Sequence, residues 1–326
     1  MKTYRQFWRA AMTGVMLAAA LPATGAQPVI ETEVEVPVEN GPLRGTLMRP
    51  EKGGGPVAVI IPGSGPTSRD GDNPNGIKAK YLRQLARGLA AEGIASIRID
   101  KRGMFGSAGS FPSANEITFD DYAADARAWL EVAREEAGTH CAWLVGHSEG
   151  GLVALLAAQE ASPSLCGLVL VAAPGRRMGE ILREQLRSNP ANGPVLPDAL
   201  SAIDALERGE KVDVSGFHPA LQQMFWPGVQ DFLIDAFSRD PAGLIAGLDL
   251  PVLIVQGDND LQVRPLDAER LSQAQPAAES LTVPGMNHVL RIVPAGDIAA
   301  NFASYSDSDQ PLAPGLARAI ARFITR

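Results

Sequence analysis

The 326-residue chain has little of several features that would mark a special class of protein. Cysteine occurs twice, charged residues make up 20% and hydrophobic residues 45%, and no repeat or low-complexity tract is present. These proportions exclude a disordered chain, a collagen-like chain and a multi-span membrane protein. Basic residues are in deficit, since 29 Lys and Arg against 37 Asp and Glu give a net charge of −8. Because nucleic acid binds to a basic face, we expect no nucleic-acid partner.

Metal and nucleotide motifs are also missing. The sequence contains no H-E-x-x-H or comparable ligand spacing, and Asp307-Ser308-Asp309 is typical of a solvated turn. The glycine-rich stretch 62–66 has neither the Lys-Ser/Thr ending of a phosphate-binding loop nor the third glycine of a dinucleotide fingerprint. We therefore expect neither a metal nor a cofactor.

The first 26 residues have the three parts of a secretory signal peptide: a basic start, an apolar core and small residues before a cleavage point (Lys2, Arg5, Arg9; Ala10 to Leu21; Thr24 to Ala26). The apolar core is shorter than the roughly 20 residues of a membrane span. Neither a nearby cysteine for lipid attachment nor an arginine pair for the twin-arginine route is present. We expect 1–26 to be a signal peptide, against the alternative of a buried N-terminal helix. The mature chain 27–326, of net charge −11, would be periplasmic or secreted without a stable membrane anchor.

Strands alternate with helices along the mature chain. Alternating valines from Val34 to Val38 and the segment Leu43 to Met48 flank a turn at 40–42 and predict a hairpin. A continuous apolar run typical of a buried parallel strand follows at 57–61, and further strand candidates lie at 94–99, 142–145, 167–171, 252–255 and 280–283. Helical periodicity appears around Leu82 to Leu89, Tyr122 to Ala133 and Leu316 to Ile324. This order predicts an α/β fold with a mainly parallel, doubly wound sheet and an antiparallel hairpin at its start.

One long segment interrupts the alternation. Residues 175–248 contain helical patterns and several prolines but no convincing strand, which predicts a helical cap inserted into a single α/β domain. Within it, Met224, Phe225 and Trp226 could line an apolar substrate pocket. They could equally form the core of the cap itself.

A nucleophile candidate follows the strand at 142–145. Gly146-His147-Ser148-Glu149-Gly150 has the form G-x-S-x-G and directly precedes a helical run. The motif alone is weak, but between a strand and a helix it predicts a sharp turn that lifts the serine above the sheet. The alternative is a tight structural turn without chemistry.

Partners for Ser148 follow in the order acid, then histidine. His288 comes just after the strand at 280–283, and Asp260 comes just after the strand at 252–255. Asp258 competes with Asp260, but we expect it to bond backbone N–H groups of its own loop. The other three histidines lie before a strand, inside the serine motif and in the cap: His140, His147 and His218.

An oxyanion hole requires two backbone N–H donors. One is expected from Glu149, the residue after the nucleophile, and the other from the loop that follows the strand at 57–61. In that loop Ser64 is the expected donor and Gly65 the alternative.

Five segments in this order resemble α/β-hydrolase-fold serine hydrolases, in particular bacterial carboxylesterases of the serine aminopeptidase-like group. They are Pro62 to Gly71, Asp100 to Gly103, Gly146 to Gly150, Gly257 to Asp260 and Pro284 to His288. The resemblance covers nearly all of residues 30–326. One departure is Ser68, where the family pattern has an acid. Asp100 and Arg102 could be mistaken for a substrate clamp, but we expect them to form a structural ion pair or loop anchor.

The resemblance implies hydrolysis of short-chain carboxylic esters through an acyl-enzyme, with a small-molecule ester as the partner. An amidase or peptidase using the same three residues is the alternative, and a non-catalytic binding protein is disfavoured by the complete set. Related dehalogenases and epoxide hydrolases carry Asp where Ser148 stands. The sequence leaves the physiological substrate and the oligomeric state open.

The two cysteines stand at the starts of strands expected to be neighbours. Cys141 and Cys166 could therefore form a disulfide in an oxidising compartment, or remain as two buried thiols. Both lie at the strand end away from Ser148, so neither is a nucleophile candidate.

Overall fold

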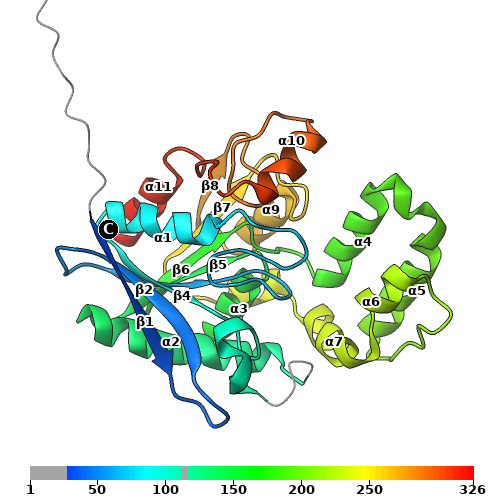
Figure 1. Cartoon of the computed structure of the whole chain (residues 1–326), viewed down its shortest axis with the longest axis horizontal. Coiled ribbons are helices and arrows are strands. Elements are labelled where there is room, and N and C mark those ends of the chain that lie inside the picture. Colours follow the sequence, from blue (N-terminus) through cyan, green and yellow to red (C-terminus); the bar gives the residue numbers. More distant parts are fainter. Residues whose placement is uncertain (1–27, 112–115) are drawn as a thin grey trace, which may run out of the picture.

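The computed structural model describes residues 28–111 and 116–326, so the expected signal peptide 1–26 lies outside the described residues. Eight strands form one sheet in the order β1-β2-β4-β3-β5-β6-β7-β8 (Figure 1). Their bounds are β1 Val29–Val36, β2 Leu43–Pro50, β3 Val57–Ile61, β4 Ala95–Ile99, β5 Ala142–His147, β6 Leu165–Val171, β7 Val252–Gly257 and β8 Glu279–Val283. The fold class expected from the alternation of strands and helices is confirmed.

The antiparallel part of the sheet is confined to its N-terminal edge. β1 and β2 form the expected hairpin, and β2 also pairs antiparallel to β4. All other neighbouring strands are parallel. Every residue of β3 and β5 is buried, because helices cover both faces of the sheet there.

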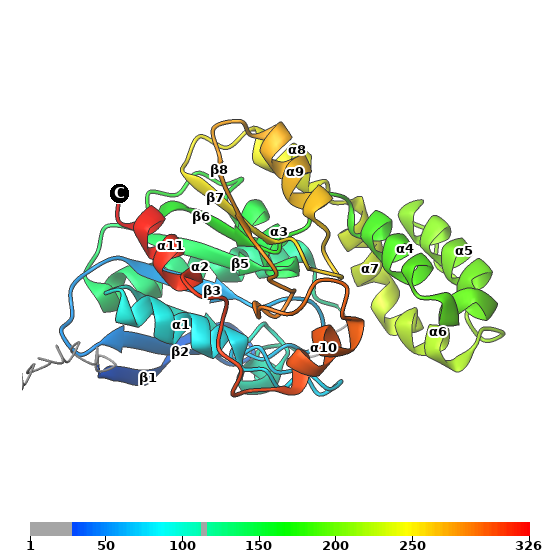
Figure 2. The same ribbon diagram turned by 90° about the horizontal axis from the view of Figure 1, so that it is seen from above.

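Two layers of helices enclose the sheet (Figure 2). On one face, α1 (Tyr81–Ala91) and α11 (Leu316–Ile324) bury one apolar cluster. On the other face lie α2 (Phe119–Ala137), α3 (Glu149–Ala157), α8 (Pro241–Ala246) and α9 (Pro265–Ala274). A short α10 (Ile298–Ala303) precedes α11, and short 3-10 helices lie at 105–110, 190–195, 227–229 and 304–306. Among the described residues, no helix is both long and apolar enough to cross a bilayer.

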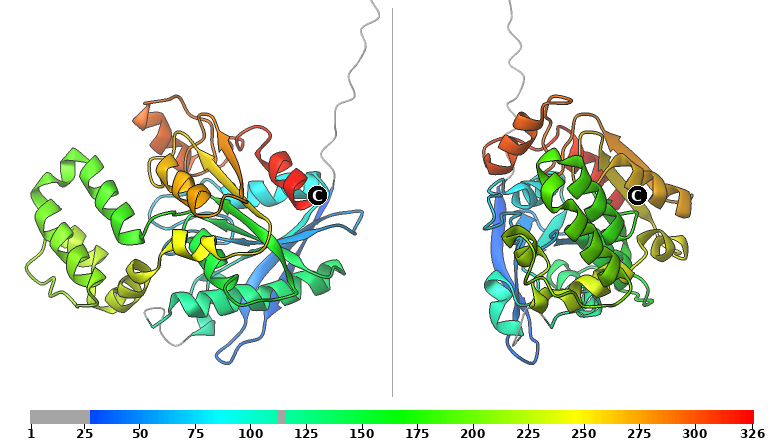
Figure 3. Two further views of the ribbon diagram at one scale, coloured as in Figure 1. Left: turned by 180° about the vertical axis from the view of Figure 1, so that it is seen from behind. Right: turned by 90° about the vertical axis from the view of Figure 1, so that its right-hand side faces the viewer.

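The segment between β6 and β7 contains helices joined by loops and no strand, and most of it projects beyond the sheet (Figure 3). Its projecting helices are α4 (Met178–Ser188), α5 (Leu196–Glu207), α6 (Pro219–Met224) and α7 (Gln230–Ser238). One contact toward the body comes from Gln185 of α4, whose side-chain amide donates to the Gln262 carbonyl at 2.9 Å. α8 belongs to the body, since it packs against α3 and α9.

The cysteine sulfurs of residues 141 and 166 are bonded to each other, with Cα atoms 5.3 Å apart. Cys141 directly precedes β5 and Cys166 lies in β6, its parallel neighbour. The bond therefore joins adjacent strands near their amino ends, while the carboxyl ends carry the site described next.

Candidate active site

Ser148 occupies a strained turn between β5 and α3. Its backbone has φ 54° and ψ −125°, a conformation that costs a non-glycine residue of the order of 1–3 kcal/mol. The turn is tight because the backbone on either side is crowded. A Cβ on Gly146 would lie 2.3 Å from the Gly150 carbonyl oxygen, and a Cβ on Gly150 would lie 2.4 Å from that of Ile61. The two glycines of the motif thus allow the serine to stand out at the carboxyl edge of the sheet.

His288 and Asp260 form a buried hydrogen-bonded pair. His288 Nδ1 lies 2.8 Å from Asp260 Oδ2, and the two residues are 5% and 2% exposed. The other carboxylate oxygen of Asp260 accepts from the N–H groups of Gln262 at 2.8 Å and Val263 at 3.0 Å. A carboxylate held in this way accepts the Nδ1 proton, which leaves Nε2 of His288 able to take a proton from a hydroxyl.

Asp258 has a different role from Asp260. Its Oδ1 accepts the Gly285 N–H at 2.6 Å and thereby joins the β7 loop to the loop that carries His288. The structure therefore places Asp260, and not Asp258, beside the histidine.

The loop after β3 lies directly against Ser148. A Cβ on Gly63 would lie 3.2 Å from Ser148 Cβ. Hydrogen bonds within the loop hold its shape, since Thr67 donates from Oγ1 to the Ser64 carbonyl and from its N–H to the Gly65 carbonyl, both at 2.8 Å. Among the described residues, the Ser64 and Glu149 N–H groups donate to no protein acceptor. Both expected oxyanion donors are thus free beside Ser148.

A cavity of about 270 Å³ brings these groups together. Its lining consists of Gly63, Ser64, Thr67, Asn73, Asn75, Ile77, Tyr81, His147, Ser148, Gln262, His288 and Val289. Asp260 is buried behind His288. The lining contains hydroxyl and amide groups but no Asp, Glu, Lys or Arg, so the cavity suits an uncharged ligand with some polar groups.

The pocket residues expected from the cap are not among this lining. Phe225 is fully buried in apolar contacts of the cap, whereas Met224 and Trp226 are 39% and 52% exposed. The alternative interpretation of Phe225, as core of the cap, fits its position. The cavity instead takes its side chains from the end of β5, from the loops after β3, β5, β7 and β8 and from α1.

His147 was not expected to take part in the site, yet it supports it. Its Nε2 lies 2.8 Å from the His288 carbonyl oxygen, and its Nδ1 lies 3.2 Å from the Tyr81 hydroxyl. A carbonyl only accepts, so Nε2 carries the proton and Nδ1 accepts from Tyr81. Burial, with His288 nearby, lowers the pKa of His147 to about 3 and keeps the ring neutral. No sequence pattern indicated this contact.

Asp100 and Arg102 anchor loops, but they do not pair with each other. Asp100 accepts from the N–H and Nε of Arg69, both at 2.9 Å, and Arg102 donates from Nε to Asp125 at 2.9 Å. The expected structural role holds with different partners. These partners lie 31 and 23 residues away in sequence, so nothing local pointed to them.

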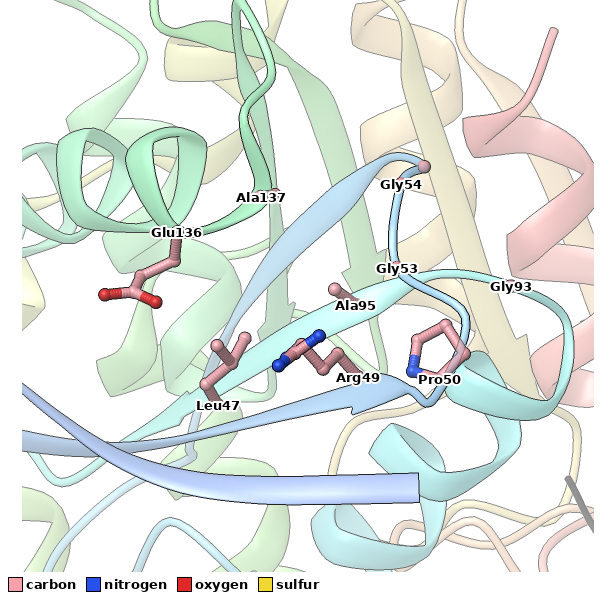
Figure 4. A pocket seen from close by; sticks show the side chains of 10 residues that line it. Leu47, Arg49, Pro50, Gly53, Gly54, Gly93, Ala95, Glu136 and Ala137 are labelled. Carbon is pink, nitrogen blue, oxygen red and sulfur yellow. The ribbon is translucent and has the colours of Figure 1, made fainter. Parts of the chain in front are cut away.

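A second hollow lies at the opposite edge of the sheet and carries no comparable chemistry (Figure 4). It measures about 50 Å³ and lies between the turn after β2 and the end of α2. Its only charged lining residues are Arg49 and Glu136. Within residues 28–111 and 116–326, no three His, Cys, Asp or Glu side chains gather into a possible metal site.

Comparison with known proteins finds a matching family and relatives that share its fold. Residues 58–301 match the model of the Alpha/beta hydrolase family. A curated relative, Esterase EstD of Thermotoga maritima, is 26% identical over 224 residues, which are 67% of this chain and 50% of EstD. The chain therefore spans about half the length of this relative.

Solved structures share the fold at low sequence identity. Est1E from Butyrivibrio proteoclasticus has a TM-score of 0.55 at 17% identity and covers 90% of this chain and 99% of its own. Proline iminopeptidase from Mycobacterium smegmatis has a TM-score of 0.57 at 16% identity and covers 90% and 97%. These likenesses concern the fold alone. Together with the family match over three quarters of its length, they show that the chain belongs to the alpha/beta hydrolase family.

Proposed function

We propose that the protein is a serine hydrolase that cleaves short-chain carboxylic esters through an acyl-enzyme. The observation that carries this proposal is the shared cavity, in which Ser148 on its strained turn faces the same space as His288, itself bonded to buried Asp260. Strain of this kind persists where the surroundings enforce it, often as part of a mechanism.

In the first half of the reaction, His288 Nε2 takes the hydroxyl proton as Ser148 Oγ attacks the ester carbonyl carbon. Asp260 stabilises the imidazolium that forms. The N–H groups of Ser64 and Glu149 donate to the oxyanion of the tetrahedral intermediate, and each such donor contributes about 3 kcal/mol. When the intermediate collapses, the alcohol leaves with the proton from His288.

In the second half, water replaces the alcohol. His288 removes its proton, the hydroxide attacks the acyl carbon, and Ser148 is released with a proton returned by His288. Because the same donors stabilise both intermediates, loss of either donor slows both halves.

The cavity favours an ester over a peptide with a free N-terminus. A volume of about 270 Å³ admits a small acyl group. A peptide's charged α-amino group calls for an acidic partner, and the lining has no Asp or Glu. The name of the relative EstD agrees with an esterase, although this chain covers half of it.

Matched substrates test the proposal. Wild type and Ser148→Ala are assayed with p-nitrophenyl butyrate and with butyryl p-nitroanilide. We expect wild type to hydrolyse the ester at least about 100-fold faster than the anilide, and Ser148→Ala to hydrolyse neither above background. Faster cleavage of the anilide would favour the amidase, and equal ester turnover by Ser148→Ala would exclude Ser148 as nucleophile.

Export to the periplasm or the medium is part of the proposal. Its support is the sequence of residues 1–26 and the bond between Cys141 and Cys166, since disulfides persist mainly in oxidising compartments. Mass spectrometry of the protein from fractionated cells should find a chain that begins at Gln27 outside the cytosol. An intact Met1 in the cytosolic fraction would contradict it.

A further inference from the structure

A buried ion pair lies behind the expected oxyanion hole. Lys101, just beyond β4, donates from Nζ to the Glu149 carboxylate at 2.8 Å and to the Gly63 carbonyl at 2.8 Å. The side chains of Lys101 and Glu149 are 2% and 4% exposed. The Tyr122 ring lies 5.3 Å from the ammonium and covers another side of it.

Each of the two residues that Lys101 contacts belongs to, or adjoins, an expected oxyanion donor. The Gly63 carbonyl belongs to the same peptide group as the Ser64 N–H, so a cation bonded to its oxygen polarises that group and makes the N–H a stronger donor. Glu149 supplies the second donor from its own backbone. One ammonium thus links the loop after β3 to the turn after β5, which carry the two halves of the hole.

Stability alone does not account for this pair. Two charges removed from water lose hydration free energy that their attraction repays only in part, and apolar residues of similar volume are often as stable. What the pair supplies, and an apolar pair would not, is a fixed distance between two loops and a positive charge on the far side of the donor peptide.

We propose that Lys101 is a positioning residue of the oxyanion hole, which orients and polarises the Gly63–Ser64 peptide and holds it to Glu149. This inference rests on the proposed function. Lys101 does not touch the substrate, so its loss should weaken stabilisation of the oxyanion and leave binding of the neutral ester nearly unchanged.

Two variants separate this role from folding. Lys101→Met removes the ammonium but leaves the Glu149 carboxylate buried without its partner. The double variant Lys101→Met/Glu149→Gln removes both charges and should recover most of the lost thermal stability. Arg102→Met is the matched control. It removes a cation from the same loop, but the partner of Arg102 is Asp125 on α2 and not a residue of the expected oxyanion hole.

The readouts are kcat and KM per active site, with sites counted by titration with a p-nitrophenyl phosphonate, and inhibition by two ketones. Ser148 Oγ adds to the carbonyl carbon of a trifluoromethyl ketone, which gives an oxyanion, and the hydroxyl proton passes to His288. The matching methyl ketone binds without this addition and so forms no oxyanion. A residue that acts only on folding changes the number of sites but not these per-site values.

We expect both Lys101 variants to lose about 10- to 100-fold in kcat with KM within about twofold, and to bind the trifluoromethyl ketone weaker by a similar factor. Binding of the methyl ketone should not change. Arg102→Met should keep the wild-type kcat per site.

The inference is overturned if the double variant regains wild-type kcat together with its stability, or if both ketones weaken equally. A wild-type protein that neither hydrolyses esters nor reacts with the phosphonate at Ser148 would instead contradict the proposed function, and with it the oxyanion hole that Lys101 is inferred to position.

Discussion

His147 and His288 are packed together, with ring centroids 4.7 Å apart, but their surroundings differ. Both line the cavity, but His147 is hydrogen-bonded through both ring nitrogens, whereas His288 has one nitrogen hydrogen-bonded, to Asp260. Burial also raises the pKa of Tyr81, so its hydroxyl keeps the proton that it donates to His147. The neutral His147 can therefore hold the backbone of His288 without competing for the proton that the proposed mechanism moves through His288.

This difference predicts a specific dependence of stability on pH. The pKa of His147 is about 3 in the folded protein and 6.5 as its ordinary value, so below pH 6.5 the unfolded chain binds the additional proton. The contribution of neutral His147 to the free energy of unfolding is therefore complete above pH 6.5 and is lost as the pH falls toward 3. Between pH 7.5 and pH 5 the free energy of unfolding should fall by about 2 kcal/mol from this group.

The comparison variant is His147→Gln, whose amide can donate to the His288 carbonyl but does not titrate. Urea unfolding at both pH values should show that wild type loses about 2 kcal/mol more than the variant on acidification. Parallel losses in the two proteins would show that His147 is not held neutral by the fold.

The two aspartates of one loop provide a second test at the residue scale. Asp260→Asn leaves the geometry near His288 but cannot hold the imidazolium, so kcat should fall by up to about 10⁴-fold. Asp258→Asn keeps an oxygen for the Gly285 N–H and should keep most of the activity. Steady-state kinetics on p-nitrophenyl butyrate measure both, and a greater loss in Asp258→Asn would reverse the assignment.

The order of residues along the chain was enough to predict most of the candidate site. Ser148, Asp260 and His288 each follow a predicted strand, and parallel strands bring their carboxyl ends to one edge, so the sequence predicted that they meet. It did not reveal the contacts of Lys101 or His147, because each bonds one backbone carbonyl, which has no side-chain signature, and one side chain distant in sequence, Glu149 and Tyr81 respectively. Phe225 was ambiguous because an apolar side chain suits a pocket and a core equally well.

At the scale of elements, the disulfide joins β5 to β6 over a separation of 25 residues. Cys141→Ser/Cys166→Ser should lower the free energy of unfolding by about 3 kcal/mol, as expected for a loop of this length. Because the bond lies at the amino ends of the strands, kcat should not change. Reductant should destabilise wild type to the level of the variant and leave the variant unaffected, whereas no difference without reductant would indicate that the bond is absent.

The elements themselves were largely predictable, and their arrangement in the cap was not. Apolar runs marked the central strands β3, β5, β6 and β7, since a strand covered on both faces has no polar side. Residues 175–248 showed helical periodicity, but their packing against one another depends on contacts between short helices. No pattern in the sequence encodes those contacts, and so it did not show that Met224, Phe225 and Trp226 lie outside the cavity lining.

At the scale of the whole molecule, the candidate site lies at one edge of the sheet. The carboxyl ends of the parallel strands carry Ser148, Asp260 and His288, while the disulfide and the small hollow of Figure 4 lie at the amino ends. The projecting helices α4 to α7 supply no side chain to the cavity lining. Substrate selection should therefore depend mainly on the loops of the body.

The measurement that tests the central claim most directly is the pre-steady-state hydrolysis of p-nitrophenyl acetate by wild type and Ser148→Ala. An acyl-enzyme on Ser148 predicts a burst of p-nitrophenol that approaches one equivalent per active site in wild type, and no burst in Ser148→Ala. A burst of equal size in both proteins would contradict the covalent serine mechanism.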